Sequence, residues 1–223
     1  FEDSIYQGKN NASGDTIAIS FYNNDLSTIN IIGGSEGKYI PDSLSDDNEY
    51  PVTYKASRIK YYLQNDESDF DGNVNIKHGG TSLDAGFVNV NWKTNMLNAL
   101  PRISGDTLSE LISPLIKEAG RDPMTGDAMT YNLKTKKGRV TKGKTKADDG
   151  FYTGKRIRNE SRESFFIENS TYTTCDHDTA HFHFESSKMK IIQNDVVVAK
   201  PIILHIEQIP IFGIPLGLSL IHI

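Results

Sequence analysis

The 223-residue sequence contains a single cysteine, Cys175. One cysteine excludes an internal disulfide framework, although its thiol can still pair with a partner outside the chain. No stretch approaches the ~20 consecutive apolar residues of a transmembrane helix. The chain opens at Phe1 without a charged-then-apolar signal segment. We therefore interpret it as a fragment of a longer protein, whose first residues do not indicate a cellular location.

Motifs for catalysis and nucleotide binding are also missing. The sequence has no G-x-S-x-G, no phosphate loop, no H-E-x-x-H, and no G-x-G-x-x-G after a predicted strand. Neighbouring carboxylates such as Asp46-Asp47 and Asp148-Asp149 lie in loops rich in Gly, Ser or Asn. Ordinary turn chemistry explains them there. We predict that the chain is not an enzyme and needs no cofactor.

What the sequence does contain is a succession of short segments in which apolar and polar residues alternate. Residues 17–21 alternate in this way, and Asn23-Asn24-Asp25 then predicts a turn. Residues 29–32 predict a second strand, closed by Gly33-Gly34. Alternation with period two is typical of half-buried strands. The sequence therefore predicts an all-β fold with a sizeable core.

The same hairpin pattern recurs along the chain. Strand pairs are predicted at residues 58–63 with 73–76, at 128–133 with 139–140, and at 188–191 with 196–198. A further strand at residues 87–92 places Val88, Val90 and Trp92 on one face. The copies lie about 60 to 70 residues apart, which is too long for a regular solenoid repeat. We expect an internally repetitive antiparallel β domain.

Residues 101–122 interrupt this pattern. Asp106-Thr107 with Glu110 resembles a helix N-cap and capping box, Leu111 and Ile112 fall on the helical face, and Pro114 ends it. We predict a short helix or linker there, between a first part of the β domain at 1–100 and a second part at 123–217. Residues 218–223 (LSLIHI) resemble a non-native tail and carry no weight in the fold prediction.

Metal-ligand residue types gather near the end of the chain. Six of them lie within nine residues, namely Cys175, Asp176, His177, Asp178, His181 and His183. Thiolate, imidazole and carboxylate are common ligands of zinc and iron. The alternative to a non-enzyme is therefore a metal-dependent, cupin-like jelly-roll enzyme built on Cys175, His177, His181 and His183. Glu185 follows too closely for the cupin spacing, and the expected glycines are not in place.

A structural interpretation of the same segment explains more of its residues. His181-Phe182-His183-Phe184 alternates as a half-buried strand requires, with phenylalanines inward and histidines toward water. Met189 and Ile191 continue one face before a turn at residues 193–195. We prefer this interpretation, and metal analysis of the purified protein separates the two.

Charge is concentrated in one segment of a chain whose net charge is −5. Residues 134–158 contain ten Lys and Arg against only Asp148 and Asp149. Nucleic acid is one candidate partner, but the segment lacks the interleaved aromatic residues of a stacking platform. We prefer the interpretation that these cations lie on the solvated outer faces of a hairpin, and we predict no nucleic-acid partner.

Hairpins with one apolar face must bury that face against another sheet. Two sheets that splay apart at one side leave a groove that suits acyl chains. The candidate groove residues are the apolar members of the predicted strands: Ile19, Phe21, Ile59, Tyr61, Leu63, Val88, Val90, Trp92, Met129, Tyr131, Leu133, Phe182, Phe184, Met189 and Ile191.

Several runs resemble one known family. They are GRDPMTGDAMTYNLKTKKGRV (residues 120–140), TKADDGFYTG (145–154), and the stretch from residue 171 to 217 that contains T-T-C at Cys175 and the pairs Ile209-Pro210 and Ile214-Pro215. Looser matches are SRIKYYL, GGTSLDAG and SEGKYIPDS. Together they resemble the periplasmic, LptA-like part of the LptD/OstA lipopolysaccharide-assembly family, over most of residues 14–217.

The resemblance implies a twisted, open antiparallel β-jelly roll, often called a β-taco. It implies lipopolysaccharide as the ligand, held by its lipid part, and a place at the periplasmic face of the outer membrane. The implied protein partners are other jelly-roll bridge proteins, stacked by their edge strands, an outer-membrane barrel downstream in the same chain, and the barrel's lipoprotein plug. It also implies that Cys175 can form a disulfide with the barrel or with another chain. A soluble periplasmic bridge protein without a barrel is the remaining alternative within the same superfamily.

Overall fold

The computed structural model describes residues 3–40, 50–103, 111–147, 150–159, 164–177, 179–192 and 195–220. Within these ranges every regular element is a β-strand, and the strands pair in antiparallel fashion. The predicted all-β class, built from antiparallel hairpins, is therefore confirmed. No helix in the described part of the chain has the length and apolar character needed to cross a membrane.

The chain divides into two compact units. Unit 1 comprises residues 1–121 and 130–135, and unit 2 comprises residues 122–129 and 136–223. The strands of unit 1 are β1 (Asp3–Gln7), β2 (Asn10–Gly14), β3 (Thr16–Tyr22), β4 (Asp25–Tyr39), β5 (Val52–Tyr62), β6 (Glu67–His78), β7 (Thr81–Asn91), β8 (Met96–Leu100), β9 (Arg102–Ile103), β10 (Leu111–Ile112) and β11 (Leu115–Glu118).

Strand β13 (Ala128–Asn132) contributes residues to both units. The strands of unit 2 are β12 (Met124–Thr125), β14 (Gly138–Ala147), β15 (Gly150–Asn159), β16 (Ser164–Thr173), β17 (Phe182–Ile192), β18 (Val196–Lys200), β19 (Ile202–Ile206), β20 (Ile209–Ile214) and β21 (Gly217–Leu220).

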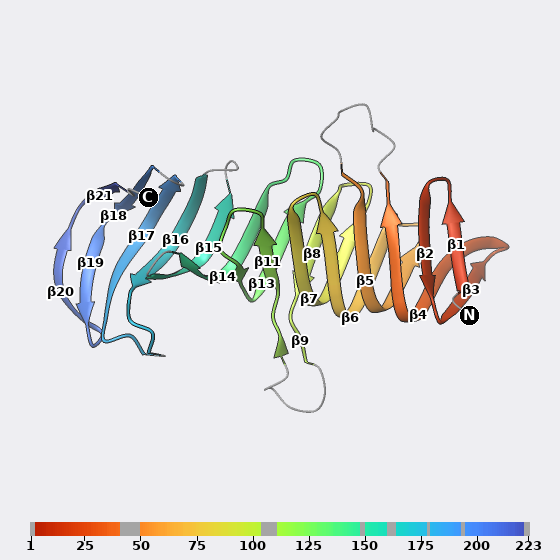
Figure 1. Ribbon diagram of the computed structural model, residues 1–223, viewed down its shortest axis with the longest axis horizontal. Coiled ribbons are helices and arrows are strands. Elements are labelled where there is room, and N and C mark those ends of the chain that lie inside the picture. Colours follow the sequence, from red (N-terminus) through yellow and green to blue (C-terminus); the bar gives the residue numbers. More distant parts are fainter. Residues whose placement is uncertain are drawn as a thin grey trace. The chain divides into compact units, whose positions relative to one another are not determined.

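Unit 1 is built from long strands that lie side by side in chain order from β3 to β8 (Figure 1). The predicted turn between β3 and β4 is confirmed, because Asn23 and Asn24 have φ values of 51° and 68°. Two consecutive left-handed residues suit a tight hairpin turn, and asparagine tolerates that conformation well. The hairpin predicted from residues 58–76 is also present, as β5 and β6.

The long strands of unit 1 are bent by irregularities that lie next to one another. The register shifts between Ile32 and Ser35 of β4, and the β5–β6 and β6–β7 pairs shift beside it. Gly33 and Gly34 supply left-handed φ values of 78° and 53° at this point. The prediction that these glycines end a strand is wrong, because a β-bulge allows β4 to continue to Tyr39.

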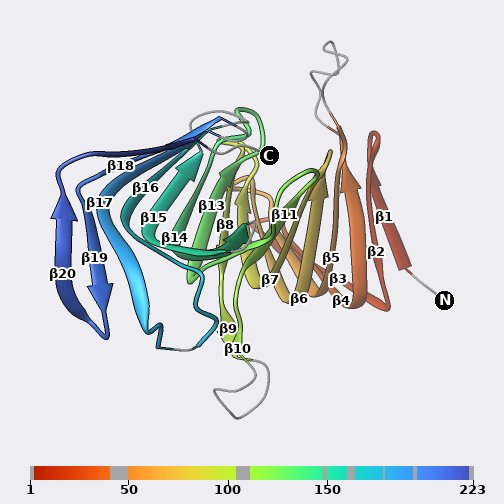
Figure 2. The same cartoon turned by 60° about the vertical axis from the view of Figure 1, so that its left-hand side comes forward.

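Unit 2 repeats the plan with strands β14 to β17, whose strong curvature is visible in Figure 2. Strands β18 and β19 both pair with β17 and are separated by Pro201. The predicted hairpin at residues 188–198 is confirmed as β17 and β18, while residues 193 and 194 of its turn lie outside the described residues. The predicted strands at 128–133 and 139–140 are present as β13 and β14, and β14 pairs with β12 and β15.

One local prediction needs correction, and the C-terminal tail takes a place in the sheet. The helix expected near residues 106–112 is wrong at its end, because Leu111 and Ile112 form strand β10 and pair with β9. Asp106, Thr107 and Glu110 lie outside the described residues. Residues 218–220 of the tail, which carried no weight in the fold prediction, belong to β21 and pair with β18. Backbone pairing needs no particular side chain, so an unusual sequence can still complete a sheet.

Candidate functional site

In unit 1, one apolar side chain from each of six strands falls into a single cross-strand row. Because the strands are paired in register, these side chains share one face of the sheet, here called the inner face of unit 1. Ile31, Ile59, Phe70 and Val88 are completely buried there. The full row is Ile17, Ile31, Ile59, Phe70, Val88 and Ala99.

The inner face continues on the far side of the bend with Tyr54. The ring of Tyr54 meets the ring of Phe70 edge-on, with centroids 5.0 Å apart, and lies 6.4 Å from the ring of Trp92. Phe70 and Trp92 belong to the opposite half of the bent strands. These aromatic contacts therefore hold the two halves of unit 1 together across its interior.

The polar ends of this aromatic group are satisfied internally. The Tyr61 hydroxyl donates to the Tyr54 hydroxyl at 3.0 Å, and Trp92 Nε1 donates to Ser68 Oγ at 2.7 Å. Burial raises the pKa of Tyr61 well above 10.0, and the neighbouring Tyr54 raises it further. Burial also raises the pKa of Tyr54, which the hydrogen bond from Tyr61 partly offsets. Both phenols therefore stay neutral at physiological pH.

The inner face of unit 1 becomes exposed at its first strand. Ile19 belongs to a second row in which Val90 and Leu97 are buried, yet Ile19 itself is 48% exposed. Phe21, two residues further along β3, is 68% exposed. Alternate residues of a strand share a face, so the apolar surface runs from the core to an exposed margin at β3.

Unit 2 has a corresponding buried row. Side chains from five strands align in it: Val140, Ile157, Ile167, Met189 and Ala199. All five are buried. The face that carries them is here called the inner face of unit 2.

A second row of unit 2 is aromatic. The rings of Tyr152 and Tyr172 are 4.7 Å apart, and Tyr172 stacks on Phe184 at 6.4 Å. The register continues this row through Leu204 of β19 to Phe212 of β20. Phe212 is 61% exposed. The preceding members of this row are half-buried, so the row ends, as in unit 1, at an exposed apolar side chain on an outer strand.

The predicted groove residues occupy three kinds of position. Six are buried: Ile59, Val88, Val90, Met129, Leu133 and Met189. Six are half-buried: Tyr61, Trp92, Tyr131, Phe182, Phe184 and Ile191. Three are exposed: Ile19, Phe21 and Leu63. Tyr54, Tyr152, Tyr172 and Phe212 were missed, because only the strand register shows that they align.

The residues of the alternative metal site do not gather into one set. Cys175 Sγ lies 3.5 Å from His181 Nδ1, and the rings of His177 and His181 are 4.8 Å apart, all in or beside the loop before β17. His183 instead lies opposite His205 on β19. Asp178, the other carboxylate considered, is outside the described residues.

The alternation of Phe182, His183 and Phe184 does form the start of a strand, since β17 begins at Phe182. His183 therefore faces away from Phe184 and the aromatic row. It is half-buried, where solvent exposure was expected. Burial lowers the pKa of His183, His205 lowers it further, and Glu185 acts in the opposite direction.

Cys175 has a free, half-buried thiol. Its backbone N–H donates to Thr173 Oγ1 at 3.0 Å, which fixes the start of the loop after β16. The disulfide expected from the family resemblance stays a prediction.

The basic segment follows the outer face of β14 and β15. The ammonium groups of Lys144 and Lys146 lie 5.7 and 5.6 Å from the centroid of the Phe151 ring. Phe151 precedes Tyr152 of the aromatic row, so it points to the opposite face. Arg156 pairs with Glu168 on β16. These contacts support the interpretation of solvated outer faces.

No family model matches the sequence, and no curated protein matches it. Among solved structures, the chain is similar to LptH of Pseudomonas aeruginosa, described as the LptA-homologous periplasmic component of the conserved lipopolysaccharide transport device. The match covers 51% of this chain and 78% of that chain, with 14% sequence identity and a TM-score of 0.41. At these values the similarity carries no argument about function.

Proposed function

We propose that this chain binds lipopolysaccharide through its acyl chains and passes it across the periplasm toward the outer membrane. The observation that carries the proposal is the course of the inner faces. In unit 1 the row that holds the buried Val90 and Leu97 ends at the half-exposed Ile19 of β3, and the exposed Phe21 follows on the same face. In unit 2 the half-buried aromatic row ends at the exposed Phe212 of β20. The sequence resemblance to the LptD/OstA family supports lipopolysaccharide as the lipid.

The energetics favour reversible binding. An acyl chain gains about 25 cal/mol for each Å² of apolar surface that it buries, or about 0.8 kcal/mol for each methylene. The central residues of the first row in each unit already pack against protein. The apolar surface open to a lipid is therefore limited to half-buried residues such as those of the aromatic row and to the exposed margins. A few exposed side chains give moderate affinity, which suits a carrier that must release its lipid.

The acyl part is the recognised part in this proposal. Lys144, Lys146 and Arg156 lie on the outer face of unit 2, where Phe151 and Glu168 are their partners. They therefore point away from the aromatic row. We assign them no contact with the lipid phosphates.

We derive the protein partners from the exposed margins of the two units and from the family resemblance. Strands β3 and β20 are the margins at which another jelly-roll protein can add a strand, since backbone pairing extends a sheet without a special sequence. An outer-membrane barrel with its lipoprotein plug is the expected acceptor, and the periplasmic face of the outer membrane is the expected location. Both rest on the family resemblance.

Binding of purified lipopolysaccharide to the whole chain tests the proposal. Phe21→Asp and Phe212→Asp place a charge in the apolar margin and should each weaken binding at least tenfold. Tyr22→Asp is the matched control for the first, because Tyr22 is 64% exposed and points to the other face of β3. It should leave the affinity unchanged.

The chemistry of the ligand gives the opposing test. Lipopolysaccharide stripped of its acyl chains should not bind, because the sugars and phosphates alone have no apolar surface to bury. Equal affinity for the intact and the deacylated ligand would overturn the proposal. Equal losses of affinity in Phe21→Asp and Tyr22→Asp would also overturn it, because binding would then not depend on the inner face of β3.

A further inference from the structure

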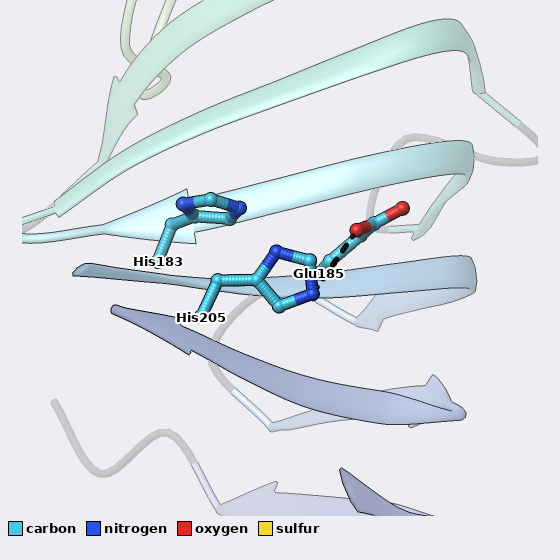
Figure 3. A group of neighbouring side chains, drawn as sticks. All are labelled: His183, Glu185 and His205. Carbon is cyan, nitrogen blue, oxygen red and sulfur yellow. Dashed lines mark ion pairs between the residues drawn. The ribbon is translucent and has the colours of Figure 1, made fainter. Parts of the chain in front are cut away.

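Three potential metal ligands converge on the face of unit 2 opposite the aromatic row. His183, Glu185 and His205 each offer one ligand atom, and these atoms lie within 4.8 Å of one another. Figure 3 shows the two imidazoles side by side, with the Glu185 carboxylate directed at His205. His205 Nε2 lies 3.5 Å from Glu185 Oε2, and the imidazole ring centroids are 4.7 Å apart.

The strand pairing itself creates this convergence. His183 of β17 is directly opposite His205 of β19, so their side chains rise from neighbouring positions of the same face. Glu185 follows His183 by two residues and shares that face. Two rigid strands therefore fix the imidazoles, and the carboxylate is carried on a longer side chain that is 48% exposed and can adjust.

We propose that His183, His205 and Glu185 bind a divalent transition-metal ion of the zinc class. Two imidazoles and one carboxylate form a ligand set that zinc uses with water in the fourth position. Ligands at ~2.0–2.2 Å from a tetrahedral ion lie about 3.4 Å apart. The pair His205 and Glu185 already has this separation, and the remaining contraction is of a size that side-chain rotation provides.

The position of the site distinguishes it from the predicted metal set and from the lipid proposal. Of the cysteine and histidines expected to bind metal, only His183 takes part, while His205 lies 22 residues further along the chain. Because the site faces away from Phe184, a bound metal touches neither the aromatic row nor Phe212. Metal binding and lipid binding can therefore succeed or fail separately. A metal here would tie β17 to β19.

Zinc binding to the whole chain, prepared without a histidine tag, tests the site. Titration with Zn²⁺ should show one ion per chain, and Co²⁺ should give the visible absorption of a tetrahedral N/O site. His183→Asn and His205→Asn should abolish stoichiometric binding, and Glu185→Gln should weaken it at least tenfold. His181→Asn and His177→Asn are matched controls from the adjacent loop and should retain full binding.

Two readouts keep the test decisive. Circular dichroism of each variant checks that the β-fold is intact, so that a loss of metal is not a loss of structure. Saturating Zn²⁺ should raise the melting temperature of the unmodified chain and not that of His205→Asn. Zinc that binds equally well to His183→Asn and His205→Asn would overturn the proposal, as would loss of binding in His181→Asn with retention in both.

Discussion

The hydroxyl groups of Tyr54 and Tyr61 lie 3.0 Å apart although both residues belong to the same strand, β5. Seven residues of straight strand span about 23 Å at ~3.3 Å per residue. The two side chains can meet only because the strand folds back on itself at the bulge between them. This hydrogen bond therefore closes the interior of unit 1 across its bend.

The buried phenol of Tyr61 should make stability fall at alkaline pH. Its pKa in the folded chain lies well above 10.0, so the unfolded chain loses this proton first as the pH rises. The stability that the neutral phenol contributes is complete below a pH of about 10 and is lost above it. Tyr61→Phe should be less stable by about 1 kcal/mol at pH 8 and should lose less on going to pH 11. Urea denaturation at both values measures this, and parallel losses in the two proteins would contradict it.

Phe70 should be among the most costly core positions. Its ring is fully buried and contacts Tyr54 from the opposite half of the unit. Phe70→Ala should reduce the free energy of unfolding by roughly 3–5 kcal/mol. Phe21→Ala is the control, because the exposed ring of Phe21 should cost no more than about 0.5 kcal/mol. Similar losses at both sites would show that the inner face is not packed as described.

Asp71 should contribute more than an ordinary surface carboxylate. It accepts a hydrogen bond from Arg58 at 2.8 Å and also forms an ion pair with Arg102, and its side chain is only 15% exposed. Asp71→Asn should cost about 1–3 kcal/mol in thermal or urea unfolding, since two charge-assisted contacts weaken together. Asp127→Asn removes a single exposed pair with Lys142 and should have no measurable effect. If Asp71→Asn left the free energy of unfolding unchanged, the arrangement of Asp71 between Arg58 and Arg102 would be refuted.

Gly150 should not tolerate even one additional carbon. A Cβ at this position would overlap the ring of Tyr172, which packs over the glycine. Gly150→Ala should displace that ring and cost about 1–3 kcal/mol. Gly213→Ala provides the comparison, because its Cβ would meet Ile203 at an ordinary 3.7 Å. The unfolding midpoint of Gly213→Ala should stay within error of that of the parent protein. A similar loss of stability in both glycine variants would contradict the packing of Tyr172 over Gly150.

Alternation of apolar and polar residues was enough to predict several strands of this chain and not others, such as β15 and β16. Residues 17–21, 87–92 and 188–198 show that a period of two, with Asn or Gly at the turns, indicates both the element type and the hairpin order. The bend was not predictable in the same way. Gly33-Gly34 reads equally as the end of a strand or as a bulge inside one, and only the pairing of β4 with β5 decides between them.

The candidate sites needed information from the register. The alternative of a metal site grouped His183 with Cys175, His177 and His181 because they are close in sequence. The structure places it beside His205, which no sequence pattern singled out. Contacts across a sheet depend on which residues of two strands stand opposite each other. Because β18 lies between β17 and β19 in the chain, no single hairpin turn sets the register of β17 with β19.

The bulges in β4 to β7 have a consequence for how such a unit can change in length. Because each of these strands runs through the bend, every one supplies a piece of both walls of unit 1. Inserting or deleting a hairpin would move both walls by the same step, about 4.8 Å per strand, and would leave the cross-section as it was. The number of hairpins therefore determines the distance that the unit spans.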